Sequence, residues 1–254
     1  MTNSSSLKGR AALITGAGMG IGRAIAESLA EAGAFVGLHC HRSVDGANEA
    51  LAAIQQRGGN GMVLQADLCD PGEATRIVDC FVEVAGRLDI LVNNAGSPIE
   101  RQKIEDCPLE LWRQILDTNL TSAFVVTQRA IPHLKRCGRG AIVNNLSLSV
   151  QTGGSNGAGA YAVAKGGLHV LTRTLARELA PNVRVNAIMP GVVETRHHEV
   201  FSSPERMEQY RRETPLGRNG TVDEVAEAVR FLVSDAAGFI NGAVLDINGG
   251  RFLR

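Results

Sequence analysis

The sequence predicts an α/β protein built on one doubly wound parallel sheet with helices on both faces. Short, nearly continuous apolar runs alternate with longer amphipathic segments along almost the whole chain. Strands without polar alternation are typical of a parallel sheet that helices cover on both sides. The 254 residues, 44% of them apolar, contain no linker, repeat or break in composition, so we expect a single domain over residues 1–254.

The first half of the chain predicts strands and helices in strict alternation. Residues 11–15 form an apolar run, and residues 21–33 form an amphipathic pattern that ends at Gly33. Pro71 occupies the favoured first turn of a later helix. The further elements expected in this half are strands over 34–40, 61–67 and 88–96, and helices over 45–58 and 71–86.

The second half continues the alternation after a longer helical stretch. The pattern over 109–136 predicts either one long helix or a broken pair, and Pro132 near its end predicts a bend. The further elements expected are strands over 140–147, 183–191 and 242–249, and helices over 158–180 and 222–234.

Composition argues against several kinds of partner. The formal net charge is zero, so no global field attracts nucleic acid or an anionic membrane. The five cysteines are irregularly spaced without a CxxC motif, which argues against zinc or a disulfide framework. We find no metal-binding constellation, no signal peptide and no run of about 18 apolar residues. We therefore expect a cytoplasmic protein with reduced thiols and without a metal, membrane or nucleic-acid partner.

A glycine-rich turn, TGAGMGIG over 15–22, joins the first predicted strand to the first helix. Ligands of such sheets bind beyond the carboxyl ends of the strands. Glycines let the backbone approach a phosphate, and the helix N-terminus offers it free N–H groups. The spacing is not GxGxxG, and a tight turn without a ligand is the alternative. The cofactor-binding residues expected here are Gly16, Gly18, Met19, Gly20, Ile21 and Gly22.

The end of the second predicted strand favours NADP(H) over NAD(H). An NAD site usually has an acidic residue there for the ribose 2′-hydroxyl, but no carboxylate precedes Asp45. Arg42, flanked by His41 and Ser43, offers a guanidinium to a 2′-phosphate. Alternatively, Arg42 is an ordinary exposed arginine and NAD(H) binds without an acid. A basic residue in place of Met19 would strengthen the NADP(H) interpretation.

Two further strand ends carry candidate cofactor contacts. Asp67, next to Leu68, ends the third strand and offers a carboxylate to the adenine amino group. The motif NNAG over 93–96 follows the fourth strand, where its amides can tie strand ends together and line the cofactor, or simply form a turn. The residues expected to bind from this motif are Asn93, Ala95 and Gly96.

Tyr161 and Lys165 form the candidate acid–base pair. They are four residues apart, so they share one face of the helix predicted over 158–180. A free tyrosine has a pKa of about 10, and a nearby ammonium lowers it. Such a tyrosine can protonate a ketone oxygen as hydride arrives, or take a proton from an alcohol. The alternative is a surface pair that only packs on its helix.

Together these motifs resemble the short-chain dehydrogenase/reductase family, over nearly the whole chain. TGAGMGIG is similar to the TGxxxGxG cofactor turn of the family, and NNAG and YAVAK match its NNAG and YxxxK motifs. PGVVET over 190–195 and DINGG over 246–250 are similar to its segments after the last two strands. The resemblance implies a Rossmann-like fold and hydride transfer between NAD(P)(H) and a ketone or secondary alcohol.

The resemblance also implies roles for individual residues. Tyr161 would be the general acid/base, while Lys165 would lower its pKa and hold the nicotinamide ribose. Asn119 would hold a water that links Lys165 to solvent. Thr195, with the backbone of Val193, would bind the nicotinamide carboxamide. The residues of the segment after the sixth strand that are expected at the cofactor are Pro190, Gly191, Val193 and Thr195, while Asn93, Ala95 and Gly96 would line its adenosine side.

The catalytic serine has two candidates. Aligning IVNNLS over 142–147 with the IVNISS strand end of the family makes Ser147 the residue that holds the substrate oxygen. Its separation from Tyr161 is then one residue longer than usual, whereas that of Ser149 is one residue shorter. Loops absorb insertions more readily than strands, so we favour Ser147 over Ser149.

A polar segment over about 192–218 is expected to determine which substrate binds. It is predicted as a short helix and loop that would close over the substrate. Arg196, His197, His198 and Arg206 lie there and offer charges to an anion, but a solvated surface is the preferred interpretation.

The resemblance favours a 3-oxoacyl-carrier-protein reductase, with a sugar or polyol dehydrogenase as the alternative. Pro132-His133 and Pro181-Asn182 occupy places where carrier-protein reductases have basic residues, which weakens the carrier-protein assignment. A non-catalytic dinucleotide sensor is the alternative of another class. The family is commonly tetrameric, so we expect a homotetramer.

Overall fold

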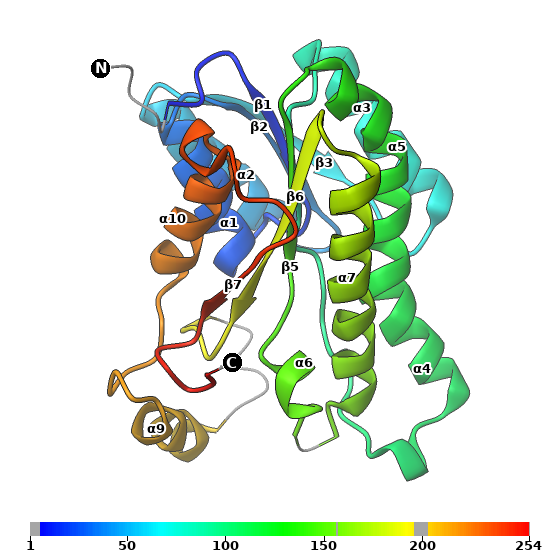
Figure 1. Cartoon of the computed structure of the whole chain (residues 1–254), viewed down its shortest axis with the longest axis vertical. Helices are drawn as coiled ribbons and strands as arrows, with labels where there is room; N and C mark the ends of the chain where they lie inside the picture. Colours follow the sequence, from blue (N-terminus) through cyan, green and yellow to red (C-terminus); the bar gives the residue numbers. More distant parts are fainter. Residues whose placement is uncertain (1–5, 156, 196–202, 254) are drawn as a thin grey trace.

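The fold is a seven-stranded parallel sheet, shown by a computed structural model that describes residues 6–155, 157–195 and 203–253. The strand order is β3-β2-β1-β4-β5-β6-β7 (Figure 1). The chain starts in the middle, runs to one edge and returns to continue on the other side of β1. The order therefore reverses between β1 and β4. The strands are β1 (Ala11–Ile14), β2 (Phe35–Cys40), β3 (Asn60–Gln65), β4 (Ile90–Asn93), β5 (Gly140–Asn145), β6 (Val183–Pro190) and β7 (Val244–Ile247).

Helices cover both faces of the sheet (Figure 1). One face carries α1 (Gly20–Glu31), α2 (Val44–Gln56) and α10 (Val222–Val233). The other face carries α3 (Pro71–Ala85), α5 (Ser122–Arg136) and α7 (Gly159–Glu178). The remaining helices are α4 (Leu109–Leu116), which leads into α5, and α6 (Ser149–Thr152) and α9 (Pro204–Glu213), which lie beyond the carboxyl ends of the strands.

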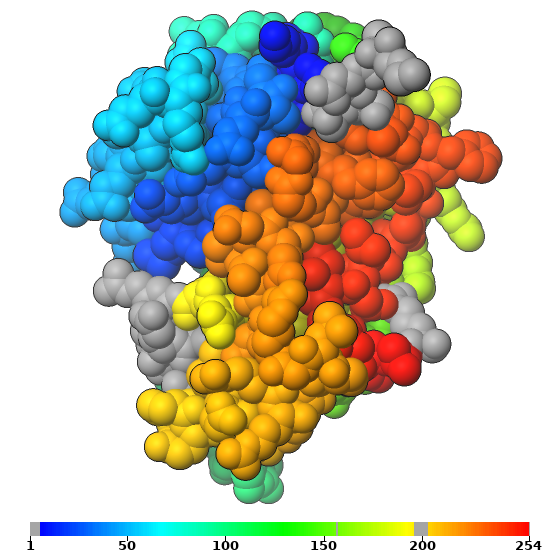
Figure 2. Space-filling model, turned by 90° about the vertical axis from the view of Figure 1, so that its left-hand side faces the viewer, coloured from blue at the N-terminus to red at the C-terminus, as the bar shows by residue number. Residues whose placement is uncertain are grey.

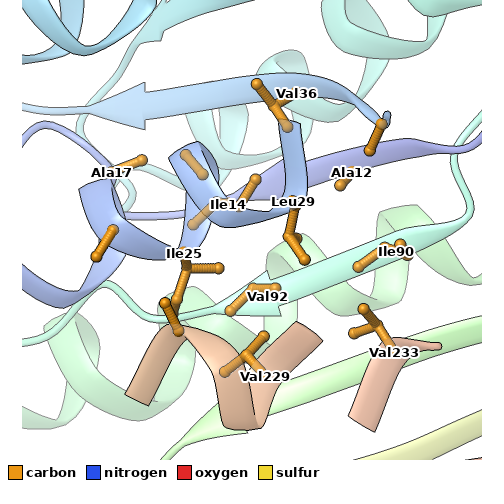
Figure 3. Close-up of a cluster of buried hydrophobic side chains, with 14 of the residues drawn as sticks. Ala12, Ile14, Ala17, Ile25, Leu29, Val36, Ile90, Val92, Val229 and Val233 are labelled. Carbon is orange, nitrogen blue, oxygen red and sulfur yellow. The ribbon is translucent and has the colours of Figure 1, made fainter. Parts of the chain in front are cut away.

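Two apolar cores follow from the alternation of side chains along each strand. Ile14 packs toward Ile25 of α1 and Val229 of α10, in the core shown in Figure 3. Its neighbour Leu13 points to the opposite core, which Phe81 of α3 also joins. Each fully buried aliphatic or aromatic side chain of this kind contributes about 1.5–3 kcal/mol, so the two cores hold the helices on the sheet.

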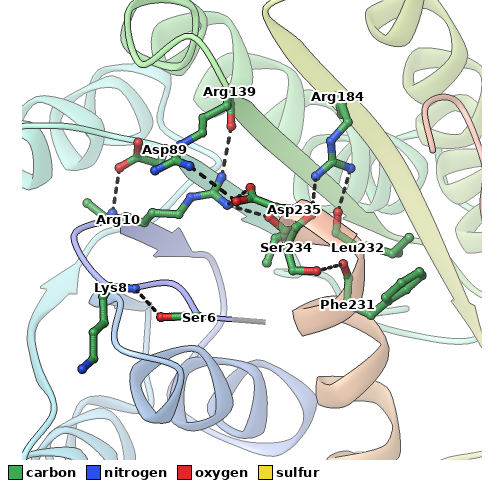
Figure 4. A network of polar contacts seen from close by, with 12 residues as sticks. Ser6, Lys8, Arg10, Asp89, Arg139, Arg184, Phe231, Leu232, Ser234 and Asp235 are labelled. Carbon is green, nitrogen blue, oxygen red and sulfur yellow. Dashed lines mark hydrogen bonds and ion pairs between the residues drawn. The ribbon is translucent and has the colours of Figure 1, made fainter. Parts of the chain in front are cut away.

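A polar network fixes the amino ends of the strands (Figure 4). Arg10 donates to the backbone oxygens of Val233 at 2.8 Å and Arg139 at 3.0 Å. Arg184 donates to the backbone oxygen of Leu232 at 2.8 Å. Both guanidiniums therefore bind carbonyls at the end of α10. These last carbonyls have no partner within the helix, and the helix dipole favours cations there.

Asp89 is the buried acid of this network. Its carboxylate accepts from the backbone N–H of Ala11 at 2.8 Å and pairs with Arg87 at 2.6 Å. Burial alone would raise the pKa of Asp89, but Arg87, the Ala11 N–H and Arg10 together hold that pKa below its ordinary value.

Most of the expected elements are confirmed to within a few residues. The break in the 109–136 helix is not at Pro132, which lies inside α5, but in a π-helical segment, Asp117–Thr121, between α4 and α5. The short helix expected over 192–218 is present as α9. No helix among the described residues is long and apolar enough to cross a bilayer.

Candidate active site

A cavity of about 640 Å³ opens at the carboxyl ends of the strands, where their order reverses between β1 and β4. This is where ligands of doubly wound sheets bind. Most of the residues expected from the sequence line it together. They are Gly16, Met19, Gly20, Ile21, Gly22, Ser43, Ala95, Gly96, Ser147, Tyr161, Lys165, Pro190, Gly191, Val193 and Thr195.

The glycine turn leaves the start of α1 open to this cavity. Gly16 has φ +66°, a conformation that side chains disfavour. A Cβ on Gly22 would collide with the Gly16 carbonyl and the Asn94 amide, so the turn closes only with glycine there. Met19, the N-cap of α1, makes no side-chain capping bond, which leaves the first N–H groups of the helix to a ligand phosphate.

Asn94 and His39 hold this turn, and the sequence interpretation missed both. Asn94 Nδ2 donates to the backbone oxygens of Thr15 at 2.9 Å and Gly16 at 3.0 Å. The Gly16 N–H donates to His39 Nδ1 at 3.1 Å, so Nε2 carries the imidazole proton and donates to the Ala66 oxygen at 3.2 Å. Burial lowers the pKa of His39 to about 4, so the ring is neutral at pH 7.

The end of β2 places Ser43 in the cavity wall and Arg42 outside it. Gly18 packs so closely on Ser43 that a Cβ there would overlap the serine side chain. Arg42 and His41 are exposed, and within the described part of the chain the Arg42 guanidinium has no hydrogen bond or ion pair. Asp67 lies 3.9 Å from His41 and accepts from the Cys69 N–H at 3.0 Å.

Leu68 and Asn93 do not line the cavity, although both were expected at the cofactor. Leu68 is buried in the core beneath α3. Asn93 Nδ2 donates to Thr127 at 2.8 Å and to Asn144 at 2.9 Å, which ties β4 to β5 and α5. Alternation explains this, because Asn93 shares its face of β4 with Leu91 while the next residue, Asn94, points to the cavity.

Tyr161 and Lys165 lie on the face of α7 that meets the cavity. Lys165 is buried, and its Nζ donates to the Asn145 backbone oxygen at 2.9 Å. That Nζ lies 5.8 Å from the centre of the Tyr161 ring. The Ser147 hydroxyl lies close enough to Tyr161 to lower the pKa of the phenol. The side chains of Tyr161, Lys165 and Ser147 therefore lie close together in the cavity wall.

The pKa of Tyr161 moves opposite to the expected direction. Burial raises the pKa of Tyr161 to about 12, and the nearby Ser147 hydroxyl opposes this only in part. Burial also lowers the pKa of Lys165 to about 8. In both groups desolvation is the main cause, because the charged form would lose its water. At neutral pH the phenol is protonated, the form that can donate a proton.

Ser147 and Ser149 both line the cavity. Ser147 follows β5, and its hydroxyl donates to that of Ser149 at 3.0 Å. The backbone N–H of Ser149 donates back to the Ser147 hydroxyl at 3.2 Å. Ser149 thus supports Ser147, and Ser147 is the serine that lowers the pKa of Tyr161.

Asn119 is buried behind the wall, in the π-helical segment. Its amide donates to the backbone oxygens of Ser97 at 2.7 Å and Ile115 at 2.9 Å, and accepts from the Ser97 N–H at 3.0 Å. Gly96 separates it from Lys165, since a Cβ on Gly96 would lie 2.6 Å from the amide oxygen and 2.9 Å from Nζ. Asn119 therefore fixes the backbone next to Lys165.

Known proteins are similar to this chain over nearly its whole length. The model of the enoyl-(acyl carrier protein) reductase family matches residues 16–251. A Streptomyces violaceoruber protein named as a ketoacyl reductase of granaticin polyketide synthesis is 40% identical, over 95% of this chain and 96% of its own. The 3-oxoacyl-[acyl-carrier-protein] reductase FabG of Staphylococcus aureus is 36% identical, over 96% and 98%.

The chain belongs to the short-chain dehydrogenase/reductase family. It is an oxidoreductase of the class that acts on CH–OH and ketone groups. A 7α-hydroxysteroid dehydrogenase complexed with NADH and 7-oxo glycochenodeoxycholic acid superposes with a TM-score of 0.93, at 34% identity over 98% of both chains. An NADP-bound protein of Agrobacterium tumefaciens, named as a 2-deoxy-D-gluconate 3-dehydrogenase, does so with a TM-score of 0.90, at 38% identity over 100% of both chains.

The segment after β6 packs against the start of α1 at one side of the cavity. Val193 forms a bridge with Gly220, and the Glu194 N–H donates to the Gly220 oxygen at 2.9 Å. These contacts bring Thr195 against Gly20 at the start of α1. Arg196, His197 and His198 lie outside the described residues.

The wall beyond the catalytic motifs is formed largely by residues that the sequence did not single out, with Arg206 as the exception. α9 lies below α10 and beside the C-terminal segment (Figure 2). From these two segments Arg206, Tyr210, Glu213 and Arg251 line the cavity, and Arg101 lines it from the loop after β4. Arg206, expected at a solvated surface, is half-buried and lines this cavity. Its Nε donates to the Tyr210 hydroxyl at 3.0 Å, at the helical spacing of four residues that was the available signal.

Proposed function

We propose that the protein is an NADPH-dependent carbonyl reductase in which Tyr161 protonates the substrate oxygen. The observation that carries this proposal is the meeting of Tyr161, Lys165 and Ser147 in one cavity with the glycine turn. Bound NADPH would supply the hydride. Ser147 would hold the ketone oxygen, and the protonated phenol would donate to it as negative charge develops. Lys165 would keep a positive charge beside the phenol.

The residues around the glycine turn fit a dinucleotide. The uncapped start of α1 suits a pyrophosphate, and the side-chain-free surfaces of Gly16 and Gly22 leave room for it. The exposed guanidinium of Arg42 suits a 2′-phosphate, with Ser43 as a second donor. The NADP-bound relative from Agrobacterium tumefaciens supports this choice, whereas the NADH-bound hydroxysteroid dehydrogenase keeps NAD(H) as the alternative.

The cofactor assignment is tested by comparing kcat/KM for NADPH and NADH. We expect NADPH to be preferred by at least about 10-fold. Arg42→Ala should lower kcat/KM for NADPH by about 10-fold and leave that for NADH within about twofold. Arg113→Ala, which removes an exposed arginine of α4, is the matched control. A preference for NADH, or equal effects of Arg42→Ala on both cofactors, would overturn the assignment.

Two substrate classes follow from the relatives. The ketoacyl reductase and FabG support 3-oxoacyl thioesters. The 2-deoxy-D-gluconate dehydrogenase name and the hydroxyls of Ser149, Thr152 and Ser155 in the wall favour a sugar or polyol as the second candidate. A panel of 3-oxoacyl thioesters, sugars and polyols, read by cofactor absorbance, separates the two. An enoyl thioester belongs in the panel because the family model is named for enoyl reduction. Dinucleotide binding without any turnover would instead indicate a sensor.

We also propose that the chain acts as one domain, with residues 192–218 as its substrate segment, in a cytoplasmic homotetramer. This rests on the resemblance to the family. Light scattering after size-exclusion chromatography gives the subunit number directly, and a monomer would contradict the proposal.

A further inference from the structure

The wall of the catalytic cavity carries an excess of positive charge, although the chain as a whole has none. The basic residues in the wall are Arg101, Lys165, Arg206 and Arg251. Among the described residues, Glu213 is the only acidic one in the wall. Charges of one sign in a cleft with low-dielectric walls attract an opposite charge far more strongly than the same charges on an open surface.

Arg101 reaches the cavity from a strained turn. Ile99 has φ +60°, which is a true outlier for a β-branched residue and costs of order 1–3 kcal/mol. Its side chain packs on the apolar cluster around Ile115 and Ala160, which holds the turn in place. The turn brings Pro98 and Arg101 into the cavity wall.

The Arg101 guanidinium has no protein partner within the described residues. Its Nε is buried without a hydrogen bond, and no ion pair is formed by the rest of the group. A buried guanidinium donor that lacks an acceptor costs free energy, and a ligand that supplied the acceptor would remove this cost.

Arg251, in the C-terminal segment, uses only one of its two Nη groups in contacts with the described residues. Its Nη2 pairs with Glu213, and its guanidinium stacks 4.5 Å from the centre of the Tyr210 ring. Its Nη1 is buried without a partner. Tyr210 and Glu213 thus fix the plane of the group while one N–H pair stays unused.

We infer that the substrate carries a carboxylate in addition to its ketone or secondary alcohol, and that Arg101 and Arg251 bind this carboxylate. The inference rests on the proposed function, because it places the carboxylate in the same cavity as Tyr161. A planar carboxylate suits the unused donors of two guanidiniums. Glu213, beside Arg251, disfavours a phosphate dianion more strongly than a singly charged carboxylate.

These arginines are separate from the dinucleotide site. The Gln102 N–H, next to Arg101, donates to the Gly157 oxygen at 3.0 Å, in the loop that leads to Tyr161. Arg251 packs on α9. α6, α9 and the C-terminus lie at one end of the molecule, beyond the strands (Figure 1). The glycine turn, by contrast, packs against β2 and Asn94.

Matched substrates test the inference. Oxo-carboxylates of increasing chain length are each compared with their methyl ester and with the analogue that ends in a phosphate. We expect the best oxo-carboxylate to exceed its ester in kcat/KM by at least about 10-fold, the effect of a charge-assisted hydrogen bond. Equal values for acid and ester, or a preference for the phosphate, would overturn the inference.

Variants assign the effect to the two arginines. Arg101→Gln should lower kcat/KM for the carboxylate by at least about 10-fold and for the ester by less than about threefold. Arg251→Gln should act in the same direction, and its unfolding temperature shows whether α9 is retained. Arg177→Gln, an exposed arginine in the last turn of α7, is the control and should change neither substrate. Equal losses for acid and ester in Arg101→Gln would mean a structural role and sink the inference.

A binding measurement separates this inference from the proposed function. A straight-chain carboxylate that lacks the ketone is titrated into the NADP-loaded protein and followed by ligand-observed NMR. Saturable binding that Arg101→Gln weakens supports the carboxylate site even if no ketone is turned over, in which case only the proposed function fails. Turnover of ketones without carboxylate binding would leave the function standing and overturn the inference.

Discussion

The two ends of the sheet differ in how far their buried polar groups are paired, although Arg10 Nε at the amino end also lacks a partner among the described residues. At the amino ends of the strands, Arg10 and Arg184 donate to backbone carbonyls, and Asp89 accepts from Ala11 and Arg87. At the carboxyl ends, buried donors of Arg101 and Arg251 and the Asn145 amide oxygen have no partner among the described residues. All three residues line the same cavity wall as Tyr161, Lys165 and Ser147.

This difference between the two ends suggests that one contributes mainly to stability and the other mainly to function. A buried polar group with partners stabilises the chain that contains it, whereas one without partners costs free energy until a ligand arrives. Changes at the amino end should therefore alter unfolding and leave catalysis intact. Changes at the carboxyl end should alter catalysis and leave unfolding nearly intact.

The largest effect is expected at the carboxyl end, from Tyr161→Phe. Removing the hydroxyl removes the proton donor, so kcat/KM should fall about 1000-fold, equivalent to about 4 kcal/mol. Because the ring remains, the unfolding temperature should stay within about 2 °C. Steady-state kinetics and thermal unfolding of the same preparation measure both. Turnover above about a tenth of wild type would contradict the acid–base role.

The next effect is expected at the amino end, from Asp89→Ala. The Ala11 N–H loses its acceptor and Arg10 loses a nearby negative charge, so the free energy of unfolding should fall by about 3 kcal/mol. Chemical denaturation measures this loss. The kcat per folded molecule should not change, and a loss of kcat without a loss of stability would break the comparison between the two ends.

Asp89 also sets a pH dependence. Its pKa is lowered in the folded state, so its stabilisation is present above the unfolded value of about 3.9 and is lost as the pH falls through the lower folded value. Denaturation midpoints at pH 7 and pH 3 should therefore differ less in Asp89→Ala than in the wild type.

The smallest effect distinguishes the two serines. Ser147→Ala should lower kcat/KM about 30-fold, or about 2 kcal/mol, because this hydroxyl contacts Tyr161 and would hold the ketone oxygen. Ser149→Ala should lower it by less than about threefold, since Ser149 acts through Ser147. Kinetics of the two variants with one ketone decide this, and the reverse order would transfer the role to Ser149.

The regular elements could be predicted because each buried strand and helix face leaves a local apolar pattern. The break at Asp117–Thr121 could not, since no glycine or proline marks it and Asn119 is held there by Ser97, from a distant loop. Alternation along β4 could have distinguished Asn93 from Asn94, because Asn93 shares the face of Leu91.

The sequence predicted the residues of the site that belong to local motifs, but not those that come from segments far apart in the chain. Tyr161 and Lys165 are four residues apart, so one helix face shows them together. Arg101 and Arg251 belong to segments that only the topology of the sheet brings to one cavity. The direction of the Tyr161 pKa likewise depends on burial by surrounding segments, which the spacing of the pair does not contain.

His39 sets a lower limit on the pH at which the glycine turn keeps its shape. As long as the ring is neutral, Nδ1 accepts the Gly16 N–H and the first three strands keep their ends aligned. Once acid protonates the ring, near pH 4, two N–H groups face each other at 3.1 Å and the turn loses its anchor. Below about pH 4 the protein should therefore lose affinity for a dinucleotide while both apolar cores remain packed. The protonation of His39 would then mark the opening of the glycine turn, a local step that precedes unfolding.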